Sequence, residues 1–357
     1  MRVTIIGCGL IGRKRALALD EDSALVACCD TNAEAAKRFS AEFSCRTFTD
    51  YRSLFHDAAR TRDESDIAIV AVVNKFARDI VLAALKAGSH VLVEKPLGRN
   101  AAEAAEIVDG LRAAQNGRHQ VLKVGFNHRF HPAVWKAREL CAGGGLGKVF
   151  SMRARYGHGG RPGMETEWRA SKDLCGGGEL LDQGVHVIDL IRWFGGEVVE
   201  TYGRTETRFW PMEVEDNAFA VLRTEREITA TFHVSWTNWK NIFSFEVFGT
   251  EGYVRVEGLG GSYGPETLEF GKRRKEGGAP DIERYEFPPE DVSWEAEWSD
   301  FMSAIREKRR AVGDAIDGLR ANEVIEAIYR SSGEGRVVRM DGEPLTARRR
   351  QCGTPEP

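Results

Sequence analysis

Three side chains in this sequence have the types and spacing to handle a substrate's oxygen atom and proton: Lys95, Asp182 and His186. Lys95 follows an apolar run, His90–Val93, and ligands of open α/β sheets bind beyond the carboxyl ends of such strands. Asp182 and His186 are four residues apart in a segment with helical periodicity, so one helix face would carry both. An imidazole can take up the hydroxyl proton when an alcohol is oxidised by hydride transfer, and a carboxylate neighbour would orient the ring. A strand-capping lysine and a core histidine are the alternatives.

A glycine-rich motif stands near the start of the chain, where Gly7-Cys8-Gly9-Leu10-Ile11-Gly12 follows the apolar run Val3–Ile6 and opens a helical pattern. In such a motif the first glycine permits a tight turn, the second lets the backbone approach a pyrophosphate, and the third allows close helix–strand packing. The helix N-terminus at Leu10 and Ile11 then faces the phosphates. The motif predicts a dinucleotide site, and a glycine-rich turn without a nucleotide is the alternative.

Asp30 lies 18 residues after Gly12, at the end of the next predicted strand, Leu25–Cys29. A carboxylate at this position accepts hydrogen bonds from a ribose 2′-hydroxyl and repels a 2′-phosphate. We therefore expect NAD rather than NADP. Four cationic residues nearby leave NADP open, although a solvated helix face is the interpretation we favour for them: Arg13, Lys14, Lys37 and Arg38.

Residues 2–126 alternate short β-branched runs with amphipathic stretches, which indicates βαβ units and a parallel sheet. We expect the α/β class, with an N-terminal doubly wound Rossmann domain in residues 1–126. The expected strands are Val3–Ile6, Leu25–Cys29, Ile67–Val73, His90–Val93 and Val121–Gly125. The expected helices are Ile11–Leu19, Ala33–Phe43, Ala77–Ala87 and Ala101–Ala114.

Residues 127–335 have a different character and predict an α+β domain with a large, mostly antiparallel open sheet for substrate binding and oligomerisation. The expected strands are Lys148–Tyr156, Val214–Arg223, Ile228–Trp236, Ile242–Phe248 and Tyr253–Glu257. The expected helices are Pro132–Leu140, Glu179–Phe194, Trp294–Glu307 and Asp314–Ser331, the last two being candidates to pack back on the Rossmann domain. Residues 336–357 are expected to form a loose polar tail.

Composition narrows the function classes. The chain has 357 residues and a formal net charge of −4, so it lacks the basic field that drives nucleic-acid binding. Its seven cysteines include no C-x-x-C pair, so neither a disulfide framework nor a metal site is expected. The longest apolar run, Ile67–Val73, is too short for a membrane span, and the N-terminus lacks a signal-peptide pattern. We expect a cytoplasmic protein with no nucleic-acid or membrane partner.

Four further stretches, together with the glycine motif, resemble the glucose–fructose oxidoreductase, inositol dehydrogenase and rhizopine catabolism family, shortened to Gfo/Idh/MocA. They carry a Glu-Lys-Pro element, an Asn-His-Arg-Phe element, a Gly-Gly-Gly and Asp-x-x-x-His element, and a Gly-Thr-Glu-Gly turn. The stretches are Gly88–Leu97, Gly125–Pro132, Gly176–Asp189 and Phe245–Glu257. The resemblance covers roughly residues 1–335, and the elements are specific in this order although each alone is common.

The resemblance implies roles for several residues. Lys95 would hydrogen-bond the reacting oxygen region, and its bond to Pro96 would be cis. His186 would be the general acid/base, and Asp182 would position the substrate or relay the proton. Asn127 would contact the substrate or cofactor. Asp189 is open between a partner of His186 and an ordinary polar position on the helix.

The sequence departs from the commonest family pattern after the fourth strand, where Val73-Asn74-Lys75-Phe76-Ala77-Arg78 replaces a Thr-Pro followed by His. We take Asn74 as the candidate there, because an amide at a strand terminus can bridge phosphate or ribose groups. The predicted cofactor-binding residues are Gly7, Gly9, Leu10, Ile11, Gly12, Asp30, Asn74, Glu94 and Lys95.

A Gly-rich loop between the strand ending at Tyr156 and the catalytic helix offers groups that recognise sugars. Aromatic faces pack on sugar C–H surfaces, and arginine forks bind carboxylate or phosphate. With Asn127, the predicted substrate-binding residues are His158, Arg161, Trp168 and Arg169, with a subunit contact or ordinary loop as the alternative.

The broad sheet has no later segment to cover its outer face, so we expect a homodimer or homotetramer through that face. Three tryptophans among the predicted strands are expected to be core or interface residues rather than a substrate platform: Trp210, Trp236 and Trp239.

Taken together, the sequence predicts an NAD(P)-dependent oxidoreductase that transfers hydride between nicotinamide C4 and a secondary alcohol or ketone. The substrate would be a sugar, a sugar derivative such as a sugar nucleotide, or a cyclitol. Two alternatives remain open. One is a redox-neutral NAD-dependent glycosidase, and the other is a non-enzymatic NAD-binding regulator, against which the set of Lys95, Asp182 and His186 argues.

Overall fold

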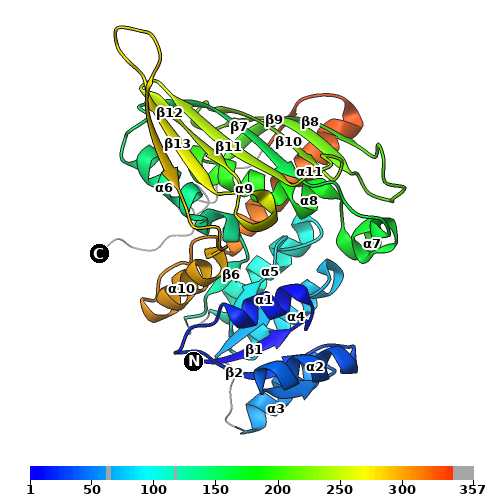
Figure 1. Ribbon diagram of the computed structural model, residues 1–357. Coiled ribbons are helices and arrows are strands. Elements are labelled where there is room, and N and C mark those ends of the chain that lie inside the picture. The colour runs from blue at the N-terminus through cyan, green and yellow to red at the C-terminus, as the bar shows by residue number, and fades with distance from the viewer. Residues whose placement is uncertain (62–65, 116–118, 341–357) are drawn as a thin grey trace, which may run out of the picture.

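The computed structural model describes residues 1–61, 66–115 and 119–340. Its elements form two sheets with helices packed between and around them (Figure 1). The first sheet lies in the lower half of Figure 1 and comes from residues 2–124, whereas the second lies in the upper half and comes from residues 149–339. The α/β fold with a large second sheet, predicted from the sequence, is confirmed.

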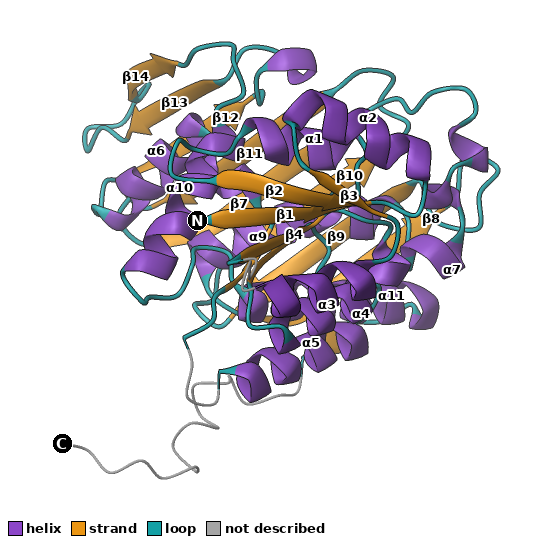
Figure 2. Cartoon of the chain, turned by 90° about the horizontal axis from the view of Figure 1, so that it is seen from below, coloured by secondary structure: helices purple, strands orange, loops and turns teal. Residues whose placement is uncertain are grey.

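The first sheet is six-stranded and parallel throughout, with the doubly wound order β3-β2-β1-β4-β5-β6. Its strands are β1 (Arg2–Ile6), β2 (Ala24–Cys29), β3 (Arg46–Phe48), β4 (Ile67–Val70), β5 (His90–Val93) and β6 (Leu122–Val124). Its connecting helices are α1 (Leu10–Leu17), α2 (Ala33–Phe43), α3 (Tyr51–Thr61), α4 (Asn74–Lys86) and α5 (Ala101–Ala114). Figure 2 shows α1 and α2 on one side of the strands and α3, α4 and α5 on the other.

Three helix starts follow the capping chemistry of the sequence. The Asn32 side chain accepts hydrogen bonds from two amides of the first turn of α2, and Asn100 accepts one from the first turn of α5. Asp314 caps α11 (Ala315–Glu334) in the same way. These caps explain why the observed starts of α2 and α5 agree with the sequence pattern.

The second sheet is nine-stranded, in the order β14-β13-β12-β11-β7-β10-β9-β8-β15. Only the central β7 and β10 pair in parallel, and every other neighbouring pair is antiparallel. The strands are β7 (Val149–Gly157), β8 (Val198–Glu206), β9 (Asn217–Thr224), β10 (Thr229–Ser235), β11 (Ile242–Gly249), β12 (Gly252–Glu257), β13 (Thr267–Lys272), β14 (Asp281–Glu286) and β15 (Val338–Arg339).

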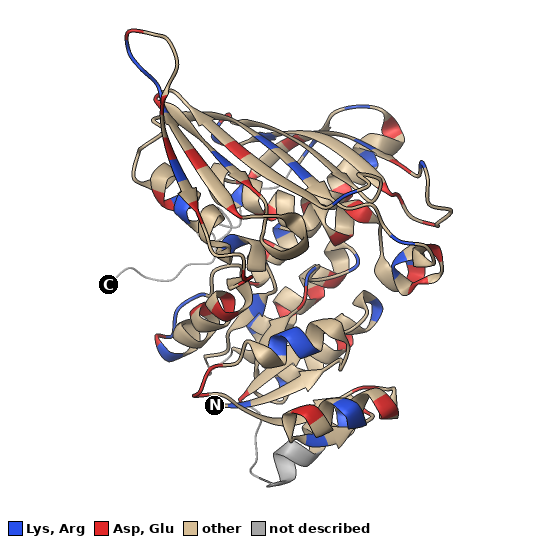
Figure 3. Ribbon diagram, in the orientation of Figure 1, with Lys and Arg blue, Asp and Glu red and all other residues tan. Residues whose placement is uncertain are grey.

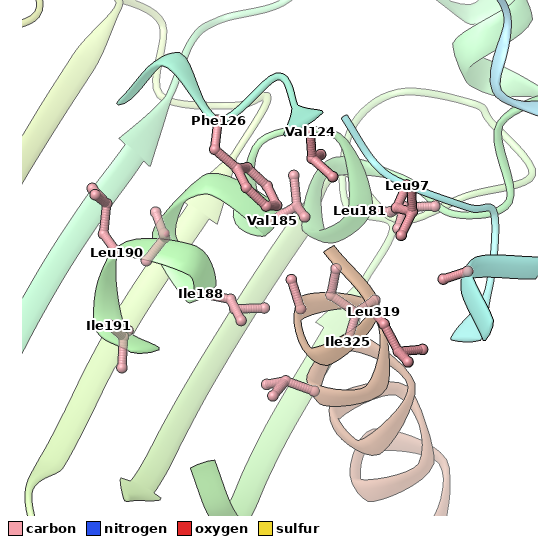
Figure 4. Packing of buried hydrophobic residues seen from close by; sticks show 14 of the residues in the cluster. Leu97, Val124, Phe126, Leu181, Val185, Ile188, Leu190, Ile191, Leu319 and Ile325 are labelled. Atoms are coloured by element: carbon pink, nitrogen blue, oxygen red, sulfur yellow. The ribbon is translucent and has the colours of Figure 1, made fainter. Parts of the chain in front are cut away.

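One face of this sheet packs on helices, which bury a continuous apolar core. The helices that follow β6 along the chain are α6 (Pro132–Ala142), α7 (Lys172–Cys175), α8 (Glu179–Asp182), α9 (Gly184–Gly195), α10 (Ser293–Arg306) and α11. Figure 4 shows α9 at the centre of this core, with Val185 and Ile188 beside Leu319 of α11 and Phe126 after β6. The same core continues to Val124 of β6 and to Leu97, which follows β5, so the two halves share one interior.

Helix α10 lies against the first sheet rather than the second. Its Trp298, Phe301 and Met302 are buried with Ile5 and Ile69 of the parallel strands. The chain therefore returns to the dinucleotide-binding half after completing most of the second sheet.

The opposite face of the nine-stranded sheet carries no helix of the described chain in Figure 1. Blue and red segments alternate along its strands in Figure 3, and ion pairs such as Arg153–Glu246 lie on it. Several large apolar side chains on the same sheet are also exposed, among them Phe150, Tyr202, Phe219 and Val221.

Several sequence predictions are corrected. The predicted helix Glu179–Phe194 is broken at Gln183 into α8 and α9, and the strand predicted to reach Val73 ends at Val70. The sequence pattern also missed β3, α3, α7, β8, β13 and β14. The expected tail begins with a strand, because β15 pairs with β8 at the sheet edge, and the rest of the tail, from residue 341, lies outside the described residues.

Candidate active site

A single cleft of about 1290 Å³ extends from the glycine-rich loop after β1 to the helices and loops beneath the second sheet. Its walls include Gly7 and Asp30 at one end and Lys95, Asp182 and His186 further in. Nearly all predicted site residues line it, and the structure thus brings together residues that are up to 179 positions apart in the chain.

The glycine loop has the shape of a phosphate cradle. Gly7 has φ +100°, and a Cβ there would lie 2.0 Å from the Ala71 carbonyl oxygen, while a Cβ on Gly12 would lie 1.9 Å from the Gly7 oxygen. Nothing lies within 4 Å of the position a Gly9 Cβ would occupy, so the loop is open there. Among the described residues no side chain caps the N-terminus of α1, which leaves its amides for an anion. These residues fit a dinucleotide pyrophosphate.

Asp30 lies at the end of β2 and holds the glycine loop in place. Its Oδ2 accepts a hydrogen bond from the Cys8 amide at 2.9 Å, and its Oδ1 accepts one from the Asn32 amide at 2.8 Å. Each carboxylate oxygen has a second lone pair, so the group can still accept from a ribose hydroxyl. Two of the four nearby cations are paired with acids on the helix surface, Arg13 with Glu42 and Lys37 with Glu34.

The position of Asn74 in the fold differs from the prediction. Asn74 is the first residue of α4 rather than the end of a strand, and its Nδ2 donates to the Cys175 carbonyl oxygen at 2.8 Å. The side chain lines the cleft, but its amide nitrogen ties α4 to α7 of the second half. Lys75 adds an ion pair with Asp173 of α7 at 2.5 Å.

Glu94 lines the cleft and belongs to a buried ion cluster. Its Oε1 accepts from Arg15 Nε at 2.7 Å, and Arg15 Nη1 donates to Glu297 Oε2 of α10 at 2.5 Å. Because Arg15 is on α1 and Glu94 precedes Lys95, the cluster joins the glycine-loop helix, the lysine strand and α10.

Lys95 and Asp182 form an ion pair at the centre of the cleft. Lys95 Nζ lies 2.7 Å from Asp182 Oδ1 and donates a second hydrogen bond to the Asp182 carbonyl oxygen at 2.6 Å. Both side chains are about four-fifths buried. The Lys95–Pro96 peptide bond is cis, as the resemblance implied.

Arg169 is the second cation beside Asp182, with its Nε 3.4 Å from Oδ2. Burial opposes ionisation of Asp182, but the charges of Lys95 and Arg169 outweigh it and lower the pKa of this carboxyl to about 2. Asp182 is therefore an anion that holds Lys95. Its carboxylate is paired with Lys95 and Arg169 rather than with the His186 ring, which the sequence pattern had suggested as its partner.

His186 is in the first turn of α9 and is almost fully buried. Its Nδ1 is buried and has no hydrogen-bond partner in the described part of the chain. Burial, followed by the charge of Lys95, lowers the pKa of His186 well below its ordinary value. The ring is consequently neutral at physiological pH, which is the form that accepts a proton.

Asp189 does not contact His186 but fastens α9 to the 3-10 turn at Asn127–Phe130. Its carboxylate forms a bidentate ion pair with Arg129, with distances of 2.7 Å and 2.5 Å. Asn127 lines the cleft, where its Oδ1 contacts His128 Nδ1 at 3.2 Å and its Nδ2 donates to Ser293 at 2.9 Å.

The predicted substrate loop reaches the cleft with His158, Arg161, Trp168 and Arg169. The two arginines expected to bind an anionic substrate already have acidic partners. Arg161 pairs with Glu167 at 2.6 Å, and Arg169 pairs with Asp182. Trp168 stacks under the Arg169 guanidinium, 4.4 Å from ring to Cζ. Trp210 and Trp236 are buried as expected, whereas Trp239 is 64% exposed.

Several cleft residues escaped the sequence analysis. Gln183 donates from Nε2 to the Tyr263 hydroxyl at 3.1 Å, and Tyr156 and His128 line the same region. His128 could have been found, since it lies between Asn127 and Arg129 of the quoted motif. Tyr263 had no signal, because it belongs to a loop that only the fold brings to the cleft.

Two features are absent from the described part of the chain. No group of three or more His, Cys, Asp or Glu side chains is arranged to hold a metal ion among these residues. None of the described helices is both long and apolar enough to cross a lipid bilayer.

A doubly wound parallel sheet with an open glycine cradle, joined to a second sheet that closes one cleft, defines a dinucleotide-binding protein of the Rossmann class. The protein-family models that match this chain agree with this class. Residues 1–123 match the oxidoreductase family model with the NAD-binding Rossmann fold, and residues 134–255 match the C-terminal domain model of the same Gfo/Idh/MocA family. The chain belongs to the Gfo/Idh/MocA family, and its first half is the NAD-binding Rossmann domain of that family.

Two curated relatives that match this chain are dehydrogenases named for sugars. A levoglucosan dehydrogenase of Pseudarthrobacter phenanthrenivorans is 30% identical over 253 residues, which are 62% of this chain and 61% of that protein. A D-glucoside 3-dehydrogenase of Escherichia coli is 31% identical over 193 residues, 53% of this chain and 52% of that protein. The matched regions thus span less than two thirds of these relatives.

A solved structure of levoglucosan dehydrogenase in complex with NADH has the same fold along nearly the whole chain. It superposes with a TM-score of 0.86 at 22% identity and covers 96% of this chain and 100% of its own. At that identity the likeness bears on the fold alone.

Proposed function

We propose that this protein is an NAD-dependent dehydrogenase or reductase that interconverts a secondary alcohol and a ketone on a sugar or cyclitol. The observation that carries the proposal is one cleft that joins the glycine cradle to the Lys95–Asp182 pair and to His186. NAD, when bound, accepts or supplies the hydride at nicotinamide C4. The chain's own residues must then hold the carbinol and move its proton.

Lys95 is the proposed ligand of the reacting oxygen. An ammonium has three N–H donors, and two of those of Lys95 go to Asp182. The third donor is available to the substrate hydroxyl, or to the carbonyl oxygen formed from it, on which negative charge develops during hydride transfer. Asp182 holds the Lys95 ammonium in one orientation and balances the charge of the ammonium.

His186 is the proposed general acid/base. Because its pKa is lowered, the ring is neutral and can accept the hydroxyl proton of an alcohol. Since Nδ1 is buried in the protein, Nε2 is the nitrogen we assign to this transfer. In the reverse direction the same nitrogen returns the proton to the ketone oxygen, and its low pKa makes it a strong acid for that step.

The substrates we propose first are uncharged sugars and their glycosides. The relatives named for levoglucosan and D-glucosides support this class. Arg161 and Arg169 already carry acidic partners, so the cleft offers less free positive charge to a phosphate or a sugar nucleotide. We expect Arg169→Ala to raise KM, and an unchanged KM would remove Arg169 from the substrate site.

We also propose that copies of the chain associate through the outer face of the nine-stranded sheet. Exposed side chains there include Phe219 at 43% and Val221 at 45%, which favours burial against a partner. Light scattering at micromolar concentration should give a dimer or tetramer. A monomer would contradict this part of the proposal.

The function is tested by incubating the full chain with NAD and a panel of levoglucosan, methyl glucosides and myo-inositol while absorbance at 340 nm is recorded. Net NADH formation with at least one compound supports the proposal. Glycoside cleavage without net NADH would support the redox-neutral glycosidase instead. Tight NAD binding with no turnover of any compound would support a regulator.

A further inference from the structure

We infer that His128 is a positioning residue for His186: a stacked imidazole that fixes the plane of the proton-transfer ring. The two rings lie face to face, with centroids 3.8 Å apart and planes 18° apart. The inference rests on the proposed function, in which His186 moves the proton. It extends that function by assigning a residue that acts only through another side chain.

His186 needs such a support because the usual one is missing from the described residues. A catalytic histidine is commonly oriented by a carboxylate or carbonyl that accepts a hydrogen bond from its second nitrogen. His186 Nδ1 has no such partner in the part of the chain the structure describes, and Asp182 is held by Lys95 and Arg169. Ring contacts therefore orient the imidazole, with His128 on one face and Phe126 at 6.2 Å in an edge-on arrangement.

His128 is itself fixed by a polar chain. Its Nδ1 lies 3.2 Å from Asn127 Oδ1, so the proton on Nδ1 donates to Asn127. The amide nitrogen of Asn127 donates to Ser293 Oγ, which in turn donates to Asp291 Oδ1 at 2.6 Å. His128 Nε2 is left buried with no partner among the described residues. The ring thus has one tautomer and one orientation.

The backbone that carries His128 is clamped to the helix that carries His186. Arg129, the next residue, is 3% exposed and forms the bidentate ion pair with Asp189, three residues after His186. Edge-on contacts to Tyr156 at 5.0 Å and Phe243 at 5.8 Å close the remaining sides of the His128 ring. The stack is therefore built into the fold rather than a chance surface contact.

The stack also bears on protonation. Two imidazoles in contact cannot both be cationic without repulsion, so His128 must stay neutral when His186 accepts a second proton and becomes cationic. Burial lowers the pKa of His128 as well, in the same direction. Ionisable groups that face the pair from the surrounding elements are Lys95, Arg15, His131 and Tyr156.

The test compares His128→Phe, which keeps a flat ring, with His128→Ala, which removes it. His56 is exposed on α3, so His56→Ala is the matched control. We expect His128→Phe to keep kcat within about threefold of the parent chain, and His128→Ala to lower kcat about tenfold with little change in KM. Equal kcat losses in both His128 variants, or an unchanged kcat in His128→Ala, would overturn the inference.

Histidine-selective ¹⁵N labelling of the NAD-bound chain gives a readout that needs no substrate. We expect His186 to stay neutral between pH 6 and 8 in the parent chain and in His128→Phe, and to titrate closer to its ordinary pKa in His128→Ala. The parent spectrum should also show His128 protonated on Nδ1, which holds even if His128→Ala fails to fold. Protonation of His128 on Nε2 would overturn the inference. Absence of sugar oxidation, by contrast, would count against the proposed function and not against the stack.

Discussion

Lys95 Nζ lies 2.7 Å from Asp182 Oδ1 and donates a second hydrogen bond to the carbonyl oxygen of the same residue. The lysine follows β5 of the parallel sheet and the aspartate ends α8 beneath the second sheet, so this one residue pair spans the cleft. Arg169 approaches the other carboxylate oxygen. In the proposed function, this contact sets the direction of the one ammonium N–H that Asp182 does not take.

Substituting Lys95 should lower kcat more than substituting Asp182. Lys95→Met deletes the donor to the reacting oxygen, and we expect kcat to fall by about 10² to 10³, by analogy with loss of an oxyanion donor. Asp182→Asn leaves the ammonium but releases it, and we expect a smaller loss in kcat. Lys37→Met, which removes an exposed ion pair with Glu34, is the matched control. A Lys95→Met enzyme with parental kcat would exclude the proposed role.

The rate of alcohol oxidation should not fall at acidic pH in the way expected when a catalytic histidine has an ordinary pKa. Alcohol oxidation needs a neutral His186 ring. Because burial and the charge of Lys95 lower the pKa of His186, the ring stays neutral even below the ordinary histidine pKa of about 6.5. We expect kcat/KM for oxidation to stay level between pH 8 and 6. A fall centred near pH 6.5 that persists in His158→Gln would show that His186 titrates normally.

Cofactor choice should depend on Asp30. A charge-assisted hydrogen bond contributes about 1.5–3 kcal/mol, so Asp30→Ala should raise KM for NAD by roughly 10-fold or more. KM for NADP should rise less or fall, because the repulsion of a 2′-phosphate is removed as well. The ratio of kcat/KM for the two cofactors measures this directly, and an unchanged ratio would contradict the assignment of the ribose to Asp30.

Glu179 should make stability pH-dependent. It is fully buried, and burial, with the nearby charge of Asp182, raises its pKa well above the ordinary value. A group whose folded pKa is raised stabilises the fold below its unfolded pKa, and this stability is lost as pH rises toward the folded pKa. Glu179→Gln, which mimics the neutral acid, should therefore gain in Tm relative to the parent chain as pH rises from 5 to 8. A constant difference in Tm would show that Glu179 is not held protonated.

Much of the fold could be predicted because its signals are local. Buried parallel strands such as Ile67–Val70 are continuous apolar runs, and Asn32 and Asn100 mark helix starts. The missed β14 lies at a sheet edge and is almost entirely exposed, so it has no alternation of apolar and polar residues. The three-residue β3 is too short to give a pattern.

The sequence predicted which residues line the cleft but not which of them bond to each other. Spacing allowed Asp182 to reach His186, yet it could not reveal that an ammonium 87 residues earlier would take the carboxylate. For the same reason the sequence could not reveal that the Asn74 amide nitrogen bonds to the Cys175 carbonyl oxygen; the assignment of Asn74 to the cofactor stays a prediction. Competition among partners is decided by tertiary packing, which single-sequence spacing does not contain.

The central claim is that a carbinol hydrogen moves to nicotinamide as a hydride while His186 takes the proton. It is tested most directly by incubating the chain and NAD with a turned-over sugar deuterated at the oxidised carbon, and measuring the mass of the nicotinamide product. We predict NADH with one deuterium, and loss of this product in His186→Asn with NAD binding unchanged. Unlabelled NADH, or undiminished labelled product in His186→Asn, would contradict the account.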